Sequence, residues 1–171
     1  MGSNGNLPFM PSRFEHRATL AAPVDTVYST LVDEAFLTAR LRDIGGKGAA
    51  LLDHRTSADG AAYKLRQGVD ANRLPGAVRS ILSGDLIVER EERWQGRESA
   101  GRATINGVPA EIKSRGRLAS KGDGTELVVS AEVKVSIPLI GGKIEKVVAE
   151  QVTKLLAAEA EYAEKWLAER A

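Results

Sequence analysis

Residues 125–137 read TELVVSAEVKVSI, and apolar and polar side chains alternate along most of this stretch. The odd-numbered positions from Leu127 to Ile137 are all apolar, whereas the even-numbered positions are mostly polar. Successive side chains of a strand point to opposite faces of a sheet. The stretch therefore predicts a long strand whose odd positions face the core and whose other face contacts water.

The segment after this strand predicts one long amphipathic helix. Pro138 ends the strand, and Gly141-Gly142 is expected to separate it from the final helix. Apolar residues, Val148 and Val152 among them, fall on one side of this helix, and charged residues such as Glu145 fall on the rest. A helix of about 27 residues is about 40 Å long, close to the length of the strand. We therefore expect one helix to cover one sheet.

The start of the chain shows the same kinds of pattern. Residues 12–20 alternate, with His16 at a position assigned to the core. Pro23 suits the first turn of a helix, and apolar residues follow it at helical spacing up to Val32. A second short helix is expected over residues 35–43, ended by glycines. The chain is thus expected to begin with a strand and two helices.

Turn signals divide the middle of the chain into further strands. Asp59-Gly60 is expected to supply the positive φ of a hairpin turn between strands at residues 49–56 and 61–69. Pro75-Gly76 interrupts the next segment, so residues 77–82 are expected to form at most a short helical turn or a loop. Three more strands, which bring the expected total to seven, are assigned to residues 86–94, 101–107 and 110–120.

Length and composition narrow the range of functions. The 171 residues suit one globular domain, which we assign to residues 10–171, with residues 1–9 as a vector-derived remnant or a flexible terminus. The formal net charge of +1 gives no strong field for a polyanion, so no nucleic-acid partner is expected. The absence of cysteine excludes disulfides, thiolate metal sites and cysteine nucleophiles.

Membrane and export signals are also missing from the sequence. No stretch contains the roughly 20 apolar residues that a membrane span needs. Residues 1–9 lack the basic start and the apolar run of a secretory signal. A cytoplasmic protein is therefore expected, and the oligomeric state is left open.

The stretch RFEHRATLAAPVDTVY, at residues 13–28, is similar to the opening strand and first helix of the START-like (SRPBCC) superfamily. Over residues 12–170 the order of elements resembles that superfamily's helix-grip fold. The resemblance implies an α+β fold: a curved antiparallel sheet of about seven strands wraps around a long C-terminal helix, and two short helices follow the first strand. The superfamily includes pollen-allergen-like carriers, polyketide cyclases and dehydrases, aromatases, lipid-transfer domains and stress-response co-chaperones. Within it, the chain is similar to an uncharacterised, mainly actinobacterial branch, a domain of unknown function. The resemblance implies a cavity but no catalytic residue.

Small side chains at inward positions favour an open interior. Ser114, Gly116 and Ala131 face the final helix in the expected sheet, and only 5% of the residues are aromatic. A pocket of some hundreds of Å³ could form there, lined mainly by apolar groups that include Val148 and Val152 of the helix. The alternative is a solid core in which the small residues let the helix pack closely against the sheet.

The strand at residues 86–94 combines an inward pattern with charge. If Val88 and Trp94 face the core, then Arg90 and Glu92 do so as well. Buried charges must pair with each other or with a ligand, so this pair could anchor a carboxylate or a phenol. The alternative, which we favour because burial of charge is costly, is a strand end that bends outward or shifts register at a bulge and leaves both charges in water.

Polar groups on other strands could share the cavity. Tyr63 and Gln67 fall on one face of their strand, and the alternative is that they only complete hydrogen bonds in the core. His16 could orient a ligand or act as a general base, with a purely structural hydrogen bond as the alternative. No role is assigned to His54. The two histidines lack metal-ligand spacing, so no metal and no cofactor are expected.

The outward face of the strand at residues 110–120 carries a basic ladder. Lys113, Arg115 and Arg117 form it, and acidic neighbours such as Glu132 can intersperse with it. A solvated outer face is therefore expected rather than a nucleic-acid stripe. The sequence also contains no Gly-x-Ser-x-Gly elbow of a serine hydrolase and no phosphate loop.

These observations support three functions. The leading one is binding or transport of a small hydrophobic molecule, such as a lipid or a polyketide-like compound, in an internal cavity. The second is a cyclase- or dehydratase-type enzyme, in which His16, Tyr63, Arg90 and Glu92 would have to converge for proton transfer. The third is a protein-binding module similar to the co-chaperone branch, which a contiguous apolar surface patch would favour.

Overall fold

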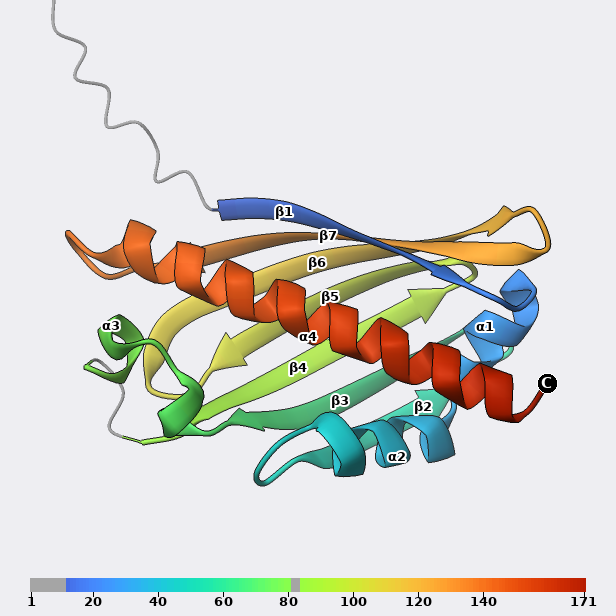
Figure 1. Cartoon of the computed structure of the whole chain (residues 1–171), viewed down its shortest axis with the longest axis horizontal. Coiled ribbons are helices and arrows are strands. Elements are labelled where there is room, and N and C mark those ends of the chain that lie inside the picture. Colours follow the sequence, from blue (N-terminus) through green and yellow to red (C-terminus); the bar gives the residue numbers. More distant parts are fainter. Residues whose placement is uncertain (1–11, 81–83) are drawn as a thin grey trace, which may run out of the picture.

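The computed structural model describes residues 12–80 and 84–171 as a curved sheet with a long helix across its concave face (Figure 1). The expectations for residues 1–9 and for residues 81–82 lie outside these ranges. The elements, in chain order, are β1 (Ser12–Leu20), α1 (Val24–Leu31), α2 (Glu34–Ile44), β2 (Ala50–Thr56), β3 (Gly60–Val69), the 3₁₀ turn η1 (Ala71–Arg73), α3 (Gly76–Arg79), β4 (Leu86–Gln95), β5 (Glu98–Ile105), β6 (Val108–Lys121), β7 (Gly124–Val135) and α4 (Gly141–Glu169).

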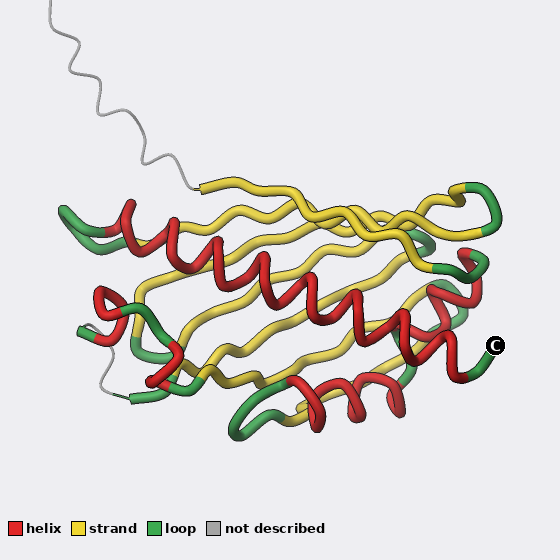
Figure 2. Tube along the Cα trace, in the orientation of Figure 1, coloured by secondary structure: helices red, strands yellow, loops and turns green. Residues whose placement is uncertain are grey.

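The strands form one antiparallel sheet in the order β1-β7-β6-β5-β4-β3-β2. From β2 to β7 each strand pairs with the next one in the chain, and β1 joins the far edge beside β7. The helices α1 and α2 carry the chain from that edge to β2 at the opposite edge (Figure 2). This arrangement confirms the helix-grip fold expected from the order of elements.

The register confirms the strand faces that alternation predicts. Val133 of β7 and Ile112 of β6 pair with each other and are buried beneath α4. The outward Val128 is also buried, because the register places it between Arg17 and Arg117. The aliphatic stems of such arginines can cover an apolar neighbour while their charged ends stay in water.

One turn differs from its expectation. Gly60 has no positive φ and belongs to β3 rather than to the turn. A Cβ at this position would lie 2.0 Å from the carbonyl oxygen of Trp94. The glycine is therefore needed for the close approach of β4, not for the backbone conformation of the hairpin.

The junction between β7 and α4 differs as well. The strand ends at Val135 rather than at Ile137, and the helix begins at Gly141, so the two glycines lie inside its first turn. Glu145, expected on the polar side of the helix, is 2% exposed. Its Oε2 accepts a hydrogen bond from the backbone N–H of Val135 at 2.9 Å, which provides a partner for a donor at the end of the strand.

The buried apolar side chains form two clusters. The first, which we call the α2 core, joins α1, α2, the sheet and the C-terminal end of α4. The second, the α3 core, joins α3, the sheet and the N-terminal half of α4. The α2 core includes Phe36, Leu37, Leu65, Trp94, Ala163 and Leu167, and the α3 core includes Leu74, Val78, Ile105, Val133, Ile144 and Val148.

Candidate functional site

A cavity of about 620 Å³ lies between α4 and the sheet. Inward residues of β1 and of β3 to β7 line it, together with residues 147–163 of the helix, and its walls include members of both cores. The α4 backbone approaches the sheet most closely at β1 and β7, at one edge, so space remains over the other strands. The interior is therefore open, and the solid-core alternative is wrong.

The middle of α4 borders this cavity and is only partly packed. Val152, Leu155 and Leu156 line it and are only partly buried, whereas Val148 and Ala163, toward the two ends, are buried. Leu155 and Leu156 pack against neither core. Two large apolar side chains thus face open volume instead of protein.

Small residues on the facing sheet create this volume. Gly101 of β5 lies opposite Ser114 of β6, and a Cβ on the glycine would come within 2.4 Å of the serine Oγ. The same arrangement recurs where Gly116 lies opposite Ser99. Both serines line the cavity. The side chains of the sheet are therefore small at these two pairs, which leaves space above them.

Lining residues with exposed side chains indicate where the cavity meets solvent. Most of them come from the end of α2, the connection to β2, the segment after β3, and α4, and one comes from β5. These residues are Asp43, Lys47, Asp70, Arg73, Lys154 and Arg102. A ligand could enter between these elements without passing through the sheet.

Charged side chains of β4 lie at the sheet side of the cavity. The side chains of Arg90 and Glu92 are 15% and 13% exposed, and the guanidinium Nε of Arg90 donates to Oε1 of Glu92 at 2.6 Å. The hydroxyl of Tyr63, directly opposite on β3, donates to the other oxygen of Glu92. The indole N–H of Trp94 donates to that hydroxyl at 3.2 Å. The expected solvated strand end is therefore wrong, because mutual pairing makes burial of both charges tolerable.

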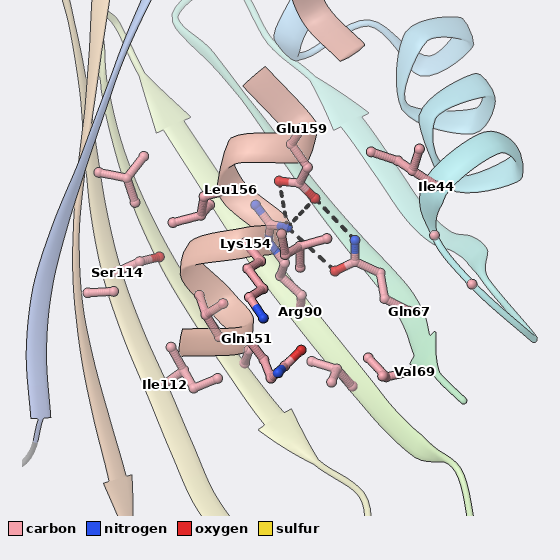
Figure 3. Close-up of a pocket in the computed structure, with 18 of the residues that line it drawn as sticks. Ile44, Gln67, Val69, Arg90, Ile112, Ser114, Gln151, Lys154, Leu156 and Glu159 are labelled. Atoms are coloured by element: carbon pink, nitrogen blue, oxygen red, sulfur yellow. Dashed lines mark hydrogen bonds and ion pairs between the residues drawn. The ribbon is translucent and has the colours of Figure 1, made fainter. Parts of the chain in front are cut away.

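Glu159 of α4 connects the Arg90–Glu92 pair of β4 to the helix (Figure 3). Nη1 of Arg90 lies 2.8 and 3.0 Å from the two oxygens of Glu159. The amide of Gln67 donates to Glu159 at 3.2 Å, and its carbonyl accepts from Arg90 at 3.4 Å. A second arginine, Arg40 of α2, places its Nη1 3.7 Å from Glu159. We call Arg40, Tyr63, Gln67, Arg90, Glu92 and Glu159 the buried polar network.

Burial and charge set the protonation states in this network. Burial raises the pKa of Tyr63 well above its ordinary value, and the adjacent Glu92 raises it further, so the hydroxyl stays a donor. Burial alone would raise the pKa of Glu159, but the charges of Arg40 and Arg90 outweigh it and lower this pKa to about 2. Burial likewise opposes the charge on Arg90, but Glu159 and Glu92 outweigh it and raise its pKa. Arg90 and Glu159 are therefore charged at neutral pH.

The structure brings together four of the residues singled out from the sequence: Tyr63, Gln67, Arg90 and Glu92. His16 also lines the cavity, but from β1, four strand positions away from β4. At about 4.8 Å per strand the path along the sheet is about 19 Å. His16 therefore does not share hydrogen bonds with the network, and the convergence that an acid–base mechanism would need is incomplete.

The remaining predicted positions lie elsewhere on the cavity wall. Ser114 lies on the same face of the sheet as Gln67 but on β6, three strands away from β3 (Figure 3). Val148 and Val152 line the cavity from the helix. His54, to which no role was assigned, lies outside the cavity lining, with its Nε2 2.7 Å from the carbonyl oxygen of Val32.

Two members of the network, Arg40 and Glu159, are absent from the sequence-based set. The sequence does indicate them, because each is a charged residue at a helix position where the periodicity of the neighbouring apolar residues would place an apolar one. Arg40 follows Phe36 by four positions, and Glu159 follows Leu155 by four, so each lies on the buried side of its helix. A search for charges on apolar helix faces would have found them.

The outer surface of the sheet carries the basic ladder as expected. Lys113, Arg115 and Arg117 are exposed, and Lys113 lies 3.4 Å from Glu111. Within residues 12–80 and 84–171, no three histidine, aspartate or glutamate side chains gather in a way that could hold a metal ion. Across the same two ranges, no helix has the length and apolarity needed to cross a membrane.

Comparison with known proteins gives one family and its relatives. A family model described as a protein of unknown function (DUF2505) matches residues 15–167. Uncharacterised proteins of Mycobacterium tuberculosis and Mycobacterium bovis are 28% identical over 170 residues, which span 92% of this chain and 98% of theirs. These relatives agree with the uncharacterised, mainly actinobacterial branch expected from the sequence.

Several solved structures have the same fold as this chain. A START superfamily protein from Mycobacterium smegmatis is 17% identical with a TM-score of 0.59, over 93% of this chain and 99% of that one. The Zhui aromatase/cyclase from Streptomyces sp. R1128 is 16% identical with a TM-score of 0.63, over 91% and 95%. A protein from Thermus thermophilus is 15% identical with a TM-score of 0.66, over 94% and 99%. The chain thus has the START-like fold, and these likenesses extend to the fold alone.

Proposed function

The chain belongs to the DUF2505 family of proteins of unknown function, and we propose that it binds a small apolar molecule in the cavity between α4 and the sheet. The observation that carries this proposal is the partial burial of Leu155 and Leu156, which line the cavity and pack against neither core. An apolar guest would cover these side chains and complete the interior. A volume of about 620 Å³ is within the range of ligand pockets.

The expected affinity can be bounded from area. About 300 Å² of apolar ligand surface removed from water contributes about 7 kcal/mol at about 25 cal/mol per Å². Loss of translational and rotational freedom on association offsets part of this gain. Micromolar binding is therefore the expected range for a guest of this size.

The buried polar network favours binding over proton-transfer chemistry. The Tyr63 hydroxyl and the Glu92 carboxylate already serve each other as hydrogen-bond partners, and His16 lies across the cavity. A cyclase or dehydratase would need these groups free and within hydrogen-bond reach of one substrate atom. A protein-binding module gains no support either, since Leu52, Leu139 and Ile140 are the only exposed large apolar residues among those described.

The proposal can be tested with the neutral apolar dye N-phenyl-1-naphthylamine, whose fluorescence rises in apolar surroundings. We expect saturable binding to the wild-type protein with a dissociation constant in the micromolar range. Ala131→Leu adds bulk at a buried position on the cavity wall and should weaken binding at least about tenfold. Ser130→Leu places a leucine one residue away, on the exposed outer face, and should leave binding unchanged.

The two variants make the result specific to the cavity. Equal weakening by both would point to a nonspecific surface effect and contradict the proposal. Absence of saturable dye binding to the wild type, together with no thermal shift in a panel of lipids and polyketide-like compounds, would also contradict it. Native mass spectrometry of gently purified protein should in addition detect any molecule retained from the cell.

A further inference from the structure

Arg40 is a buried cation with one side left unpaired. Its side chain is 6% exposed, and its ion-pair contact is from Nη1 to Oε1 of Glu159 at 3.7 Å. Its Nε and Nη2 are buried and have no hydrogen-bond partner among the described residues. Leaving the N–H groups of a buried charge without an acceptor is unfavourable, and native structures rarely do so without a reason.

The two unpaired nitrogens form a single recognition edge. In a guanidinium, Nε and Nη2 direct their hydrogens to the same side, parallel to each other. This spacing matches the two oxygens of a carboxylate, which it can bind through two parallel hydrogen bonds. The edge that Arg40 leaves free is therefore the edge suited to bidentate carboxylate binding.

Neighbouring groups leave this edge unneutralised. Glu159 is closer to Arg90, at 2.8 and 3.0 Å, than to Arg40, and it also accepts from Gln67. Phe36 lies under the Arg40 guanidinium at 5.8 Å from the ring centroid, and contact with a ring face uses the plane of the group rather than its edge. Arg90, by contrast, is saturated by two carboxylates, so it is not free to anchor a ligand.

The position of Arg40 fits a ligand with a polar head and an apolar body. Arg40 lines the same cavity as Leu155 and Leu156, and these two precede Glu159 by about one helical turn. Farther along the cavity, Val148 and Val152 of α4 and Leu74 and Val78 near α3 give an apolar wall. From Glu159 back to Val148 the helix spans about 16 Å at 1.5 Å per residue.

We infer that the ligand of this cavity is an apolar molecule with a terminal carboxylate, which Arg40 binds through Nε and Nη2 while the apolar body covers Leu155 and Leu156. This inference rests on the proposed function and specifies its ligand class. Both nitrogens are buried beside the cavity that Arg40 lines, so an ion pair formed with them is weakly screened by salt.

The test compares two probes that differ only in the head group. Dodecanoate and 1-dodecanol, each below its aggregation limit at pH 7, compete with bound N-phenyl-1-naphthylamine. We expect wild-type protein to bind dodecanoate about tenfold or more tightly than 1-dodecanol, in line with a charge-assisted bidentate pair.

Variants of Arg40 test whether its Nε and Nη2 are the cause of the preference for dodecanoate. Arg40→Met should abolish the preference and leave the affinity for 1-dodecanol within about twofold of the wild type. Arg40→Lys keeps the positive charge but not the two parallel N–H donors of a guanidinium, so it should retain only a small part of the preference for dodecanoate. Arg42→Met, at an exposed arginine on the same helix that does not line the cavity, should change neither affinity. Retained dye binding shows that each variant is folded.

The possible failures are distinguishable. Equal affinity of the wild type for both probes would overturn the inference and leave the proposed function standing. A preference for dodecanoate that survives Arg40→Met would overturn the role of Arg40. Failure of the dye to bind the wild-type protein would overturn the proposed function itself and this inference with it.

Discussion

The C-terminal end and the middle of α4 present similar apolar faces to very different surroundings. At the C-terminal end, Phe36 of α2 is fully buried and packs against Trp166 and Tyr162, with ring centroids 5.4 and 5.8 Å apart. In the middle, Leu155 and Leu156 border the cavity and pack against neither core. The helix thus supplies an apolar stripe along its length, and only part of that stripe is covered by protein.

The facing residues account for the difference. At the packed end the sheet and α2 contribute large side chains such as Leu65, Trp94 and Phe36. Under the middle of the helix the sheet contributes Gly101, Ser114 and other small residues. Contact and dispersion energy are lost where no partner atom reaches the helix, so the same residue type stabilises one region and not the other.

Glu159 stands between the two regions, and its removal should have the largest effect. Glu159→Gln leaves the buried Arg40 and Arg90 with one carboxylate, Glu92, to balance two positive charges. We expect a loss of about 3–5 kcal/mol in the free energy of unfolding, measured by urea denaturation at pH 7. Glu161→Gln, on the exposed side of the same helix, should lose less than about 0.5 kcal/mol.

The pH dependence of this effect follows from the lowered pKa. The pKa of Glu159 falls from 4.5 to about 2 in the folded protein, so its contribution is complete above pH 4.5. That contribution is lost as pH falls from 4.5 toward 2, because the unfolded chain then binds a proton at this carboxylate that the folded protein does not yet bind. The gap in stability between the wild type and Glu159→Gln should shrink over that window. A gap that stays constant down to about pH 2 would contradict the charged assignment of Glu159.

Paired leucine truncations sharpen the comparison between the two regions. Leu37→Ala removes a fully buried side chain from the α2 core and should lower the free energy of unfolding by about 2–5 kcal/mol. Leu156→Ala removes the same atoms from the cavity wall, where little packing is lost, and should cost about 1 kcal/mol or less without ligand. Urea denaturation of both ligand-free variants measures the contrast. Similar losses at the two positions would mean that Leu156 is packed after all.

An alanine-to-leucine substitution in each of the two regions should change the stability of the protein in opposite directions, and by less than the truncations do. Ala131→Leu places added carbon atoms in the cavity and should stabilise the ligand-free protein by about 1 kcal/mol. Ala61→Leu adds the same atoms to the α2 core and should destabilise it by about 1–3 kcal/mol, through overpacking. Thermal unfolding of the two variants checks the sign. Destabilisation by both would indicate that no usable space lies beside Ala131.

Alternation and turn chemistry were enough to predict most of the fold. The strand β1 was predicted with its observed bounds, because regular alternation and a following proline mark both its ends. The prediction of a positive φ at Gly60 was wrong, because the glycine is needed for the close approach of the Trp94 backbone on another strand. The local sequence does not show that approach. Glu145 was placed in water for a similar reason, since its partner, the N–H of Val135, becomes unpaired only in the folded sheet.

The candidate site was less accessible to sequence reasoning. The inward direction of Arg90 and Glu92 followed from alternation, but their burial depended on partners from β3 and α4. Those partners include Glu159, which is 69 residues from Arg90 in the chain. Pairing of this kind is set by tertiary contact, so a local pattern can indicate an inward charge but not what neutralises it.

Methyl NMR on selectively labelled protein tests the central contrast most directly. On titration with N-phenyl-1-naphthylamine, the methyl resonances of Val152, Leu155 and Leu156 should shift saturably, while those of Leu37 and Leu167 in the α2 core, which do not line the cavity, should stay in place. Absence of saturable shifts in the first group, or equal shifts in both groups, would contradict an open apolar cavity beneath the middle of α4.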